Sequence, residues 1–292
     1  MSFDLKANLS KLDEQTIRDC LESIKATDLK TARIDELKRM LMRVIEAYAT
    51  YPVEIENLEA VFRAVKHTEA EKGQYLTDLK RLYPHRDFLK RLGRANRERQ
   101  PIFYLSVDDG VALNEIKAAV GDVCTILECR ARNNATPLLM PIRIHEMARK
   151  HNARIGGDFP EPAIRIEELL ENDPECIRKH KMIEDFIAEE FLKVVDEGQE
   201  DLYKPTIAIA ELLLNFGTDE QPIDGIAYPS IACEGINANL ALLPEAFHRI
   251  YEPVACRVIR IVEALPDQGF RYDEKTARHI SDNGRIDWAN GK

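Results

Sequence analysis

One stretch of 25 residues, GRANRERQPIFYLSVDDGVALNEIK (93–117), limits what this chain can fold into. The run Pro101–Val107 is rich in β-branched and aromatic residues and predicts a strand. Asp108 and Asp109 then offer side-chain oxygens to the free amides of a following helix. We expect one face of that helix to carry Ala112, Ile116 and Ala119, with Glu115 beside it. Tyr104 and Glu115, on consecutive packed elements, are then expected to face one site.

Composition sets the outer limits. The chain has 292 residues, 45% hydrophobic and 32% charged, which suits one large globular domain or two small ones. No apolar run approaches the roughly 20 residues that span a bilayer, and the N-terminus lacks a secretory pattern. The expected place is the cytoplasm, with no membrane partner. A net charge of −10 argues against a nucleic-acid partner.

Residues 11–49 are predicted to form two packed helices with a break at 27–31, since apolar residues recur at helical spacing. Ala60–Val65 is predicted as a strand that contains Arg63. Arg63 is either a solvent-facing strand residue or a guanidinium that clamps phosphate or carboxylate. The basic stretch 80–99 also has two interpretations: a solvated loop or a surface that faces phosphate.

The remaining chain adds elements but few motifs. We predict a strand at 122–130, a short helix from Pro141 to Lys150, a loop at 152–162, and helical structure over 164–195 with a long helix from Pro174. A further helix, 205–216, is expected to end at Gly217 in a C′ position. The strand Asp224–Ser230 ends in Tyr-Pro-Ser, and the tail is expected to hold one more strand, at 256–262, with Trp288 packed against a domain edge.

Several common sites are not supported by the sequence. The six cysteines form no C-x-x-C pair, the histidines show no paired-ligand spacing, and we predict no metal. No G-x-G-x-x-G or P-loop pattern is present. Ser230 lies in no G-x-S-x-G elbow, so a serine hydrolase is rejected.

The order of these pieces resembles a known family. The G-R-x-N loop (GRAN, 93–96), the strand with Tyr104, the helix with Glu115, and then YPS ending at Ser230 with NLAL from Asn239 to Leu242 are similar to the RES domain. That family is named for an arginine, a glutamate and a serine. It includes NAD-degrading toxins of bacterial toxin–antitoxin pairs. The resemblance covers about residues 58–261.

The resemblance implies an α+β fold, an ADP-ribosyltransferase-like mixed sheet surrounded by helices. Residues 1–52 would be an N-terminal helical extension, and residues 53–292 the RES-like catalytic domain. It also implies cleavage of the nicotinamide–ribose bond of NAD, which is the substrate, and no separate cofactor. Such cleavage passes through an oxocarbenium-like state that a carboxylate can stabilise.

The resemblance assigns catalytic roles to Glu115, Arg63, Tyr104 and Ser230. Glu115 would lie near the ribose, Tyr104 would stack on the nicotinamide, Arg63 would hold the pyrophosphate, and Ser230 would bond the nicotinamide amide or a phosphate oxygen. Three further residues are assigned to substrate binding or loop shape: Arg94, Asn96 and Asn239. One departure is that some members have a tyrosine directly after the first arginine, where this chain has Ala64.

Three functions remain open. The preferred one is an NAD glycohydrolase or NAD phosphorylase, a toxin-type activity. The second is a protein ADP-ribosyltransferase, which uses the same residues, and the third is a non-catalytic binding module, which the co-occurrence of the four residues disfavours. A separate antitoxin protein is expected from the family alone, and the sequence leaves a homo-oligomer undecided.

Overall fold

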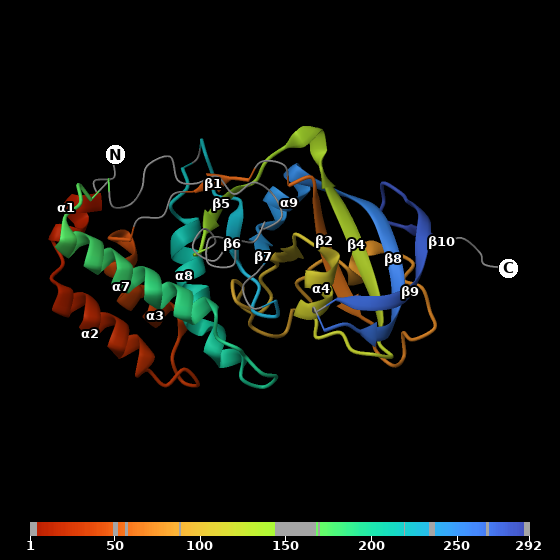
Figure 1. Cartoon of the computed structure of the whole chain (residues 1–292), viewed down its shortest axis with the longest axis horizontal. Coiled ribbons are helices and arrows are strands. Elements are labelled where there is room, and N and C mark those ends of the chain that lie inside the picture. The colour runs from red at the N-terminus through yellow and green to blue at the C-terminus, as the bar shows by residue number, and fades with distance from the viewer. Residues whose placement is uncertain are drawn as a thin grey trace.

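The computed structural model describes residues 5–48, 52–55, 58–87, 89–143, 168, 170–218, 220–233, 237–266 and 269–288. These residues form an α+β structure in which a large mixed sheet is covered by helices (Figure 1). The predicted fold class is confirmed at this level.

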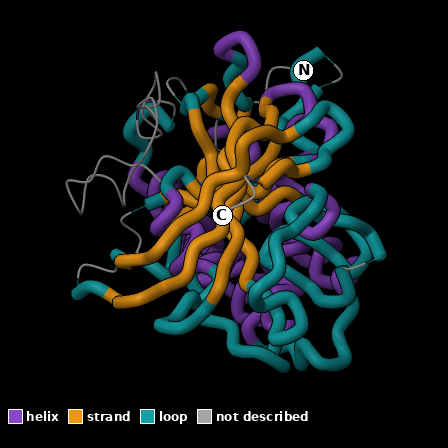
Figure 2. The backbone as a smooth tube through the Cα atoms, turned by 90° about the vertical axis from the view of Figure 1, so that its right-hand side faces the viewer, coloured by secondary structure: helices purple, strands orange, loops and turns teal. Residues whose placement is uncertain are grey.

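The described strands form one ten-stranded sheet in the order β1-β5-β6-β7-β3-β2-β4-β8-β9-β10. The β5–β6 pair is parallel, and the other pairs are antiparallel. Figure 2 shows the strands passing through the middle of the molecule, with helices around them. The strands are β1 (Val53–Glu54), β2 (Ala60–Lys66), β3 (Phe103–Ser106), β4 (Val123–Ala131), β5 (Leu138–Pro141), β6 (Gly225–Pro229), β7 (Ala238–Leu242), β8 (Tyr251–Ala264), β9 (Phe270–Ile280) and β10 (Ile286–Trp288).

A cluster of helices covers one face of the sheet at β5, β6 and β7, on the left of Figure 1. Its apolar faces share one core with Met140, Ile226 and Ala241 of the strands. Burial of such contiguous apolar faces is the main source of stability for helices of this length. The helices are α1 (Leu5–Ser10), α2 (Glu14–Lys25), α3 (Ile34–Glu46), α7 (Pro174–Phe191) and α8 (Lys204–Leu214).

Two smaller cores complete the packing. Helix α4 (Asp109–Glu115) packs with β2, β4 and β8 through Leu113, Ala64 and Ile259. Helix α9 (Pro244–Ile250) packs on the other face, where the ring of Phe247 is stacked on that of Phe103, with their centroids 3.8 Å apart. Short 3-10 turns lie at η1 (Leu79–Arg81), η2 (Arg132–Asn134) and η3 (Glu200–Tyr203).

The N-terminal prediction is confirmed, because α2 and α3 are two helices separated at residues 26–33. These two helices share one hydrophobic core with α7 and α8, so they contact the rest of the chain directly. The division at residue 52 stays a prediction.

Other predictions need correction. Pro141 ends strand β5 and begins no helix, since its neighbours pair with β6; residues 144–150 and the predicted loop 152–162 lie outside the described part. Helix α7 ends at Phe191, before the predicted end at residue 195, and Val194 lies beyond it and is 65% exposed. Gly217 is not the C′ residue of α8, because that helix is capped by Asn215. A Cβ on Gly217 would lie 2.6 Å from the backbone nitrogen of Ile223, so this close approach favours glycine at position 217.

The tail holds more structure than predicted, since β8, β9 and β10 form the end of the sheet where one strand was expected. Trp288 packs as expected, with its ring stacked on Tyr75 and its Nε1 donating to the carbonyl of Leu76 at 2.6 Å. Within the described ranges, no helix is both long and apolar enough to cross a membrane.

Candidate functional site

Glu115 is the last residue of α4, which begins where β3 ends. Asp108 caps this helix, and its Oδ1 accepts from the amides of Gly110 at 2.9 Å and Val111 at 3.2 Å. The helix is shorter than predicted, because Ile116 is its C-cap and Lys117 follows with a φ of 51°. Ala119 therefore lies outside it. This early end places the Glu115 carboxylate at the C-terminus of the helix.

Two side chains hold one oxygen of that carboxylate. Oε1 of Glu115 accepts from Oγ of Ser230 and from Nδ2 of Asn239, each at 2.6 Å. Ser230 and Asn239 are 0% and 3% exposed, whereas Glu115 is exposed. Because short donors to an ionised acceptor are the stronger kind of hydrogen bond, the position of Oε1 is well defined. Among the described residues, no partner is found for Oε2.

A second set of contacts orients the two donors. Oγ of Ser106 donates to Oδ1 of Asn239 at 2.8 Å, which turns the amide nitrogen toward Glu115. The amide of Cys233 donates to Oγ of Ser230 at 3.3 Å. Ser230 thus gives its only proton to the carboxylate, and the structure uses it to hold Glu115, a different role from the direct substrate contact that the sequence suggested.

Strand register explains why these residues meet. Asn239 on β7 pairs with Tyr228 on β6 and with Ser106 on β3, so the three form a row across neighbouring strands. Directly paired residues project from the same face of a sheet. The sequence analysis missed Ser106 and Tyr228, and the only signal for them is this pairing of distant strands.

Tyr104 is fixed by the loop that precedes it. Its phenol oxygen accepts from the amide of Ala95 and donates to Oδ1 of Asn96, both at 2.8 Å. A Cβ on Gly93 would lie 2.3 Å from that Oδ1 and 2.8 Å from the phenol oxygen, so only glycine fits here. Burial raises the pKa of Tyr104, which stays neutral at physiological pH. Asn96 thus joins the loop to Tyr104, and its part in substrate binding stays a prediction.

Arg94 lies on the same side. Its Nη2 donates to the carbonyl of Lys193, just past the end of α7, at 2.8 Å. Its guanidinium carbon is 5.2 Å from the ring centre of Tyr203, a cation–π distance. Nη1 is buried and has no hydrogen-bond partner in the described part of the chain.

Burial and the charge of Glu115 raise the pKa of two further tyrosines that the sequence analysis did not single out, Tyr203 and Tyr228. Burial raises the pKa of Tyr228 well above its ordinary value, and Tyr104 and then Glu115 add to the increase. Burial also raises the pKa of Tyr203; Arg94 lowers it and Glu115 raises it. Both phenols are therefore neutral near physiological pH. We define the Glu115 cluster as these residues: Arg94, Tyr104, Glu115, Tyr203, Tyr228, Ser230 and Asn239.

Arg63 is not brought to this cluster. Strand alternation places it with Val61 and Val65, on the face of β2 opposite to Phe62, which is paired with Ser106. Its Nη1 donates to the backbone carbonyl of Tyr104 at 3.1 Å. Burial lowers the pKa of Arg63 to about 10, and its Nε has no partner among the described atoms. Arg94, by contrast, lies beside Tyr203, whose pKa responds to both Arg94 and Glu115.

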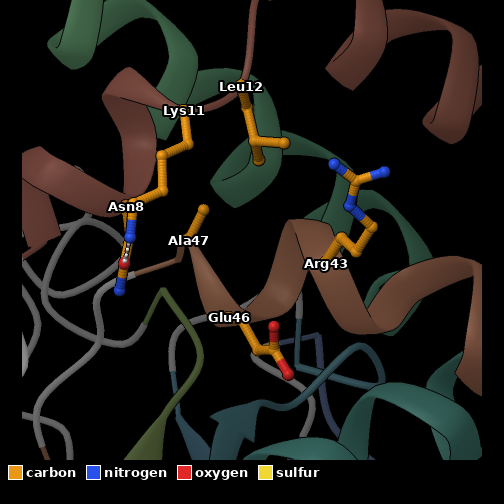
Figure 3. A pocket seen from close by; sticks show the side chains of 6 residues that line it. All are labelled: Asn8, Lys11, Leu12, Arg43, Glu46 and Ala47. Carbon is orange, nitrogen blue, oxygen red and sulfur yellow. Dashed lines mark hydrogen bonds between the residues drawn. The ribbon is translucent and has the colours of Figure 1, made fainter.

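Other parts of the structure offer less chemistry. Four arginines of the basic stretch are engaged in ion pairs: Arg81, Arg91, Arg97 and Arg99. A hollow of about 380 Å³ lies between α1 and α3, and Lys11 there donates to Asn8 (Figure 3). No group of three His, Cys, Asp or Glu side chains suited to a metal ion is found in the described ranges.

Comparison with known proteins gives no match, neither to a family model, nor to a curated protein, nor to a solved structure.

Proposed function

We propose that this protein is an NAD-consuming enzyme that cleaves the bond between nicotinamide and ribose. One observation carries the proposal: Ser230 and Asn239 fix Oε1 of Glu115 at 2.6 Å each, which leaves its second oxygen for a ligand. The resemblance of the GRAN, Tyr104, Glu115 and YPS segments to the RES domain supports it. We extend the proposal to the core, as an ADP-ribosyltransferase-like sheet.

The chemistry needs a fixed negative charge beside the ribose. When the C1′–N bond breaks, its electron pair neutralises the pyridinium ring and the ribose becomes positively charged. A carboxylate already held in place stabilises this charge without reorganising, and its free oxygen can accept from a ribose hydroxyl. Water or phosphate then bonds to C1′ and gives up a proton.

The surrounding groups suit the rest of such a ligand. Arg94 presents a buried Nη1 that lacks a described partner, and a guanidinium of this kind suits a phosphate oxygen. Tyr203, which is half-buried, offers aromatic surface beside it, on which a nicotinamide or adenine ring can pack. In this proposal Arg94 takes the role that the sequence analysis gave to Arg63, and Ser230 and Asn239 act through Glu115.

The test is release of nicotinamide from NAD by the purified full chain, with and without inorganic phosphate. Glu115→Gln keeps the shape of the side chain and is expected to lower the rate at least about 100-fold. Glu22→Gln, an exposed change on α2 with the same loss of charge, is the matched control and should leave the rate unchanged.

The outcomes separate the candidate activities. Release that requires phosphate identifies a phosphorylase, and release without phosphate identifies a hydrolase. Release of nicotinamide with transfer of labelled ADP-ribose to a protein, and with no free ADP-ribose or ADP-ribose phosphate, would replace both with a transferase. Intact NAD with the unsubstituted protein, or equal rates for Glu115→Gln and Glu22→Gln, would refute the proposal.

A further inference from the structure

An ion-pair network ties the loop of residues 93–97, which we call the site loop, to two helices. Arg97 ends the loop, and its Nε and Nη2 donate to the two carboxylate oxygens of Glu211 on α8 at 2.5 and 3.0 Å. Nη2 also donates to Asp35 in the first turn of α3 at 2.5 Å. Lys38 of α3 donates to Glu211 at 2.8 Å.

The same loop carries groups of the Glu115 cluster or their supports. Arg94 belongs to the cluster, the amide of Ala95 donates to the phenol oxygen of Tyr104, and Asn96 accepts from it. Within the loop, Gly93 and Asn96 pair through their backbones, and Nδ2 of Asn96 donates to the carbonyl of Arg97 at 2.9 Å. Arg97 therefore lies three residues from Arg94, in the same hydrogen-bonded loop.

We propose that Arg97 is a positioning residue of the site, through which the N-terminal helix α3 and helix α8 hold the site loop in its binding geometry. This inference rests on the proposed function for its effect on NAD, and it gives the N-terminal helices a role in catalysis. Arg97 touches no member of the Glu115 cluster in the described contacts and acts through the loop backbone.

The geometry distinguishes this network from an ordinary surface pair. An isolated exposed pair contributes little to stability, but here Glu211 is only 15% exposed and is gripped by a two-nitrogen fork. One guanidinium spans carboxylates from two different helices, which a lysine ammonium cannot do with the same directionality. The side chain of Arg97 bonds to the helices, while its backbone amide donates to Oε1 of Gln100 at 3.2 Å.

The test compares Arg97→Gln and Arg97→Lys with Arg18→Lys, which alters an exposed arginine paired within α2. Amide hydrogen exchange is measured on the protein without ligand, and KM and kcat for NAD are measured separately. Arg97→Gln should speed exchange of the Ala95 amide about tenfold relative to α3 and α8 and raise KM more than it lowers kcat. Arg97→Lys should restore part of both effects.

The exchange and kinetic measurements test the two proposals separately. If the protein consumes no NAD, the proposed function falls, and the exchange of Ala95 still decides whether Arg97 holds the loop. If exchange rises equally in the loop, α3 and α8, or if KM is unchanged in Arg97→Gln while NAD is consumed, Arg97 only stabilises the fold and the inference is wrong. Arg18→Lys should change neither measurement.

Discussion

At the scale of residues, the site depends on buried donors that face an exposed carboxylate. Ser230 and Asn239 are almost fully buried, and each gives Glu115 a hydrogen bond of 2.6 Å. Hydrogen bonds to a charged group contribute about 1.5–3 kcal/mol each. Removing either donor should therefore leave the Glu115 carboxylate held by a single hydrogen bond and less firmly placed.

We expect Ser230→Ala and Asn239→Ala to lower kcat/KM for nicotinamide release about 10- to 100-fold each, which corresponds to one such bond. Asn239→Asp should lower it further, although its shape is conserved, because a negative acceptor replaces the donor and repels Glu115. The control is Asn283→Asp in the β9–β10 turn, whose Oδ1 only accepts hydrogen bonds. An Asn239→Asp enzyme more active than Asn239→Ala would contradict this account.

The resemblance to the RES domain pointed to Glu115, Ser230 and Asn239, and the structure places them in contact. The sequence could not supply the partners that register creates. Ser106 is 133 residues from Asn239 and reaches it only because β3 pairs with β7. Arg63 shows the opposite case, since one position of strand alternation sends its side chain away from Glu115.

At the scale of elements, the apolar pattern predicted the long amphipathic helices and five of the ten described strands, which are β2, β3, β4, β6 and β8. Helices α2, α3 and α7 show apolar residues at helical spacing and were found. Strand β9 was missed because its sequence, FRYDEKTARHI, has few apolar residues and is largely exposed. Helix α9 has only seven residues, too few for its period to be visible.

Helix α4 provides a prediction at this scale, because its start is fixed by one side chain. Asp108→Ala removes the cap and should cost about 1 kcal/mol of stability. Asp13→Ala removes the equivalent cap of α2 and should cost a similar amount. Only Asp108→Ala should also lower the rate of nicotinamide release, because α4 carries Glu115. Urea unfolding and the rate assay measure the two effects, and equal rates in both variants would disconnect α4 from the site.

At the scale of the whole molecule, the helices and the sheet meet at the site. Arg94 lies between the end of α7 and Tyr203, while Glu115 lies over β7. The site loop is joined to α3 and α8 by Arg97. A displacement of the helical cluster from the sheet would therefore also move Arg94 relative to Glu115.

The contact of Glu211 with Arg97 and Lys38 should make the free energy of unfolding depend on pH in the acid range. Burial raises the pKa of Glu211, but hydrogen bonds from Arg97 and Lys38 outweigh it, so the pKa of Glu211 lies below its ordinary value. A carboxylate of this kind contributes stability above the ordinary value, about 4.3, and loses that contribution as the pH falls through its lowered pKa.

Glu211→Gln should accordingly lower the free energy of unfolding at pH 7 by about 1.5–3 kcal/mol, since two cations lose a charged acceptor. Below about pH 4.3 the difference from the unsubstituted protein should shrink, because Glu211 of the unfolded chain becomes protonated there, and it is lost once the pH falls below the lowered pKa of the folded protein. Glu189→Gln, which breaks the exposed pair with Lys25, should change stability by no more than about 1 kcal/mol at either pH. Urea unfolding at pH 7 and pH 3.5 measures both variants, and a difference that grows in acid would show that Glu211 is not held as an ion.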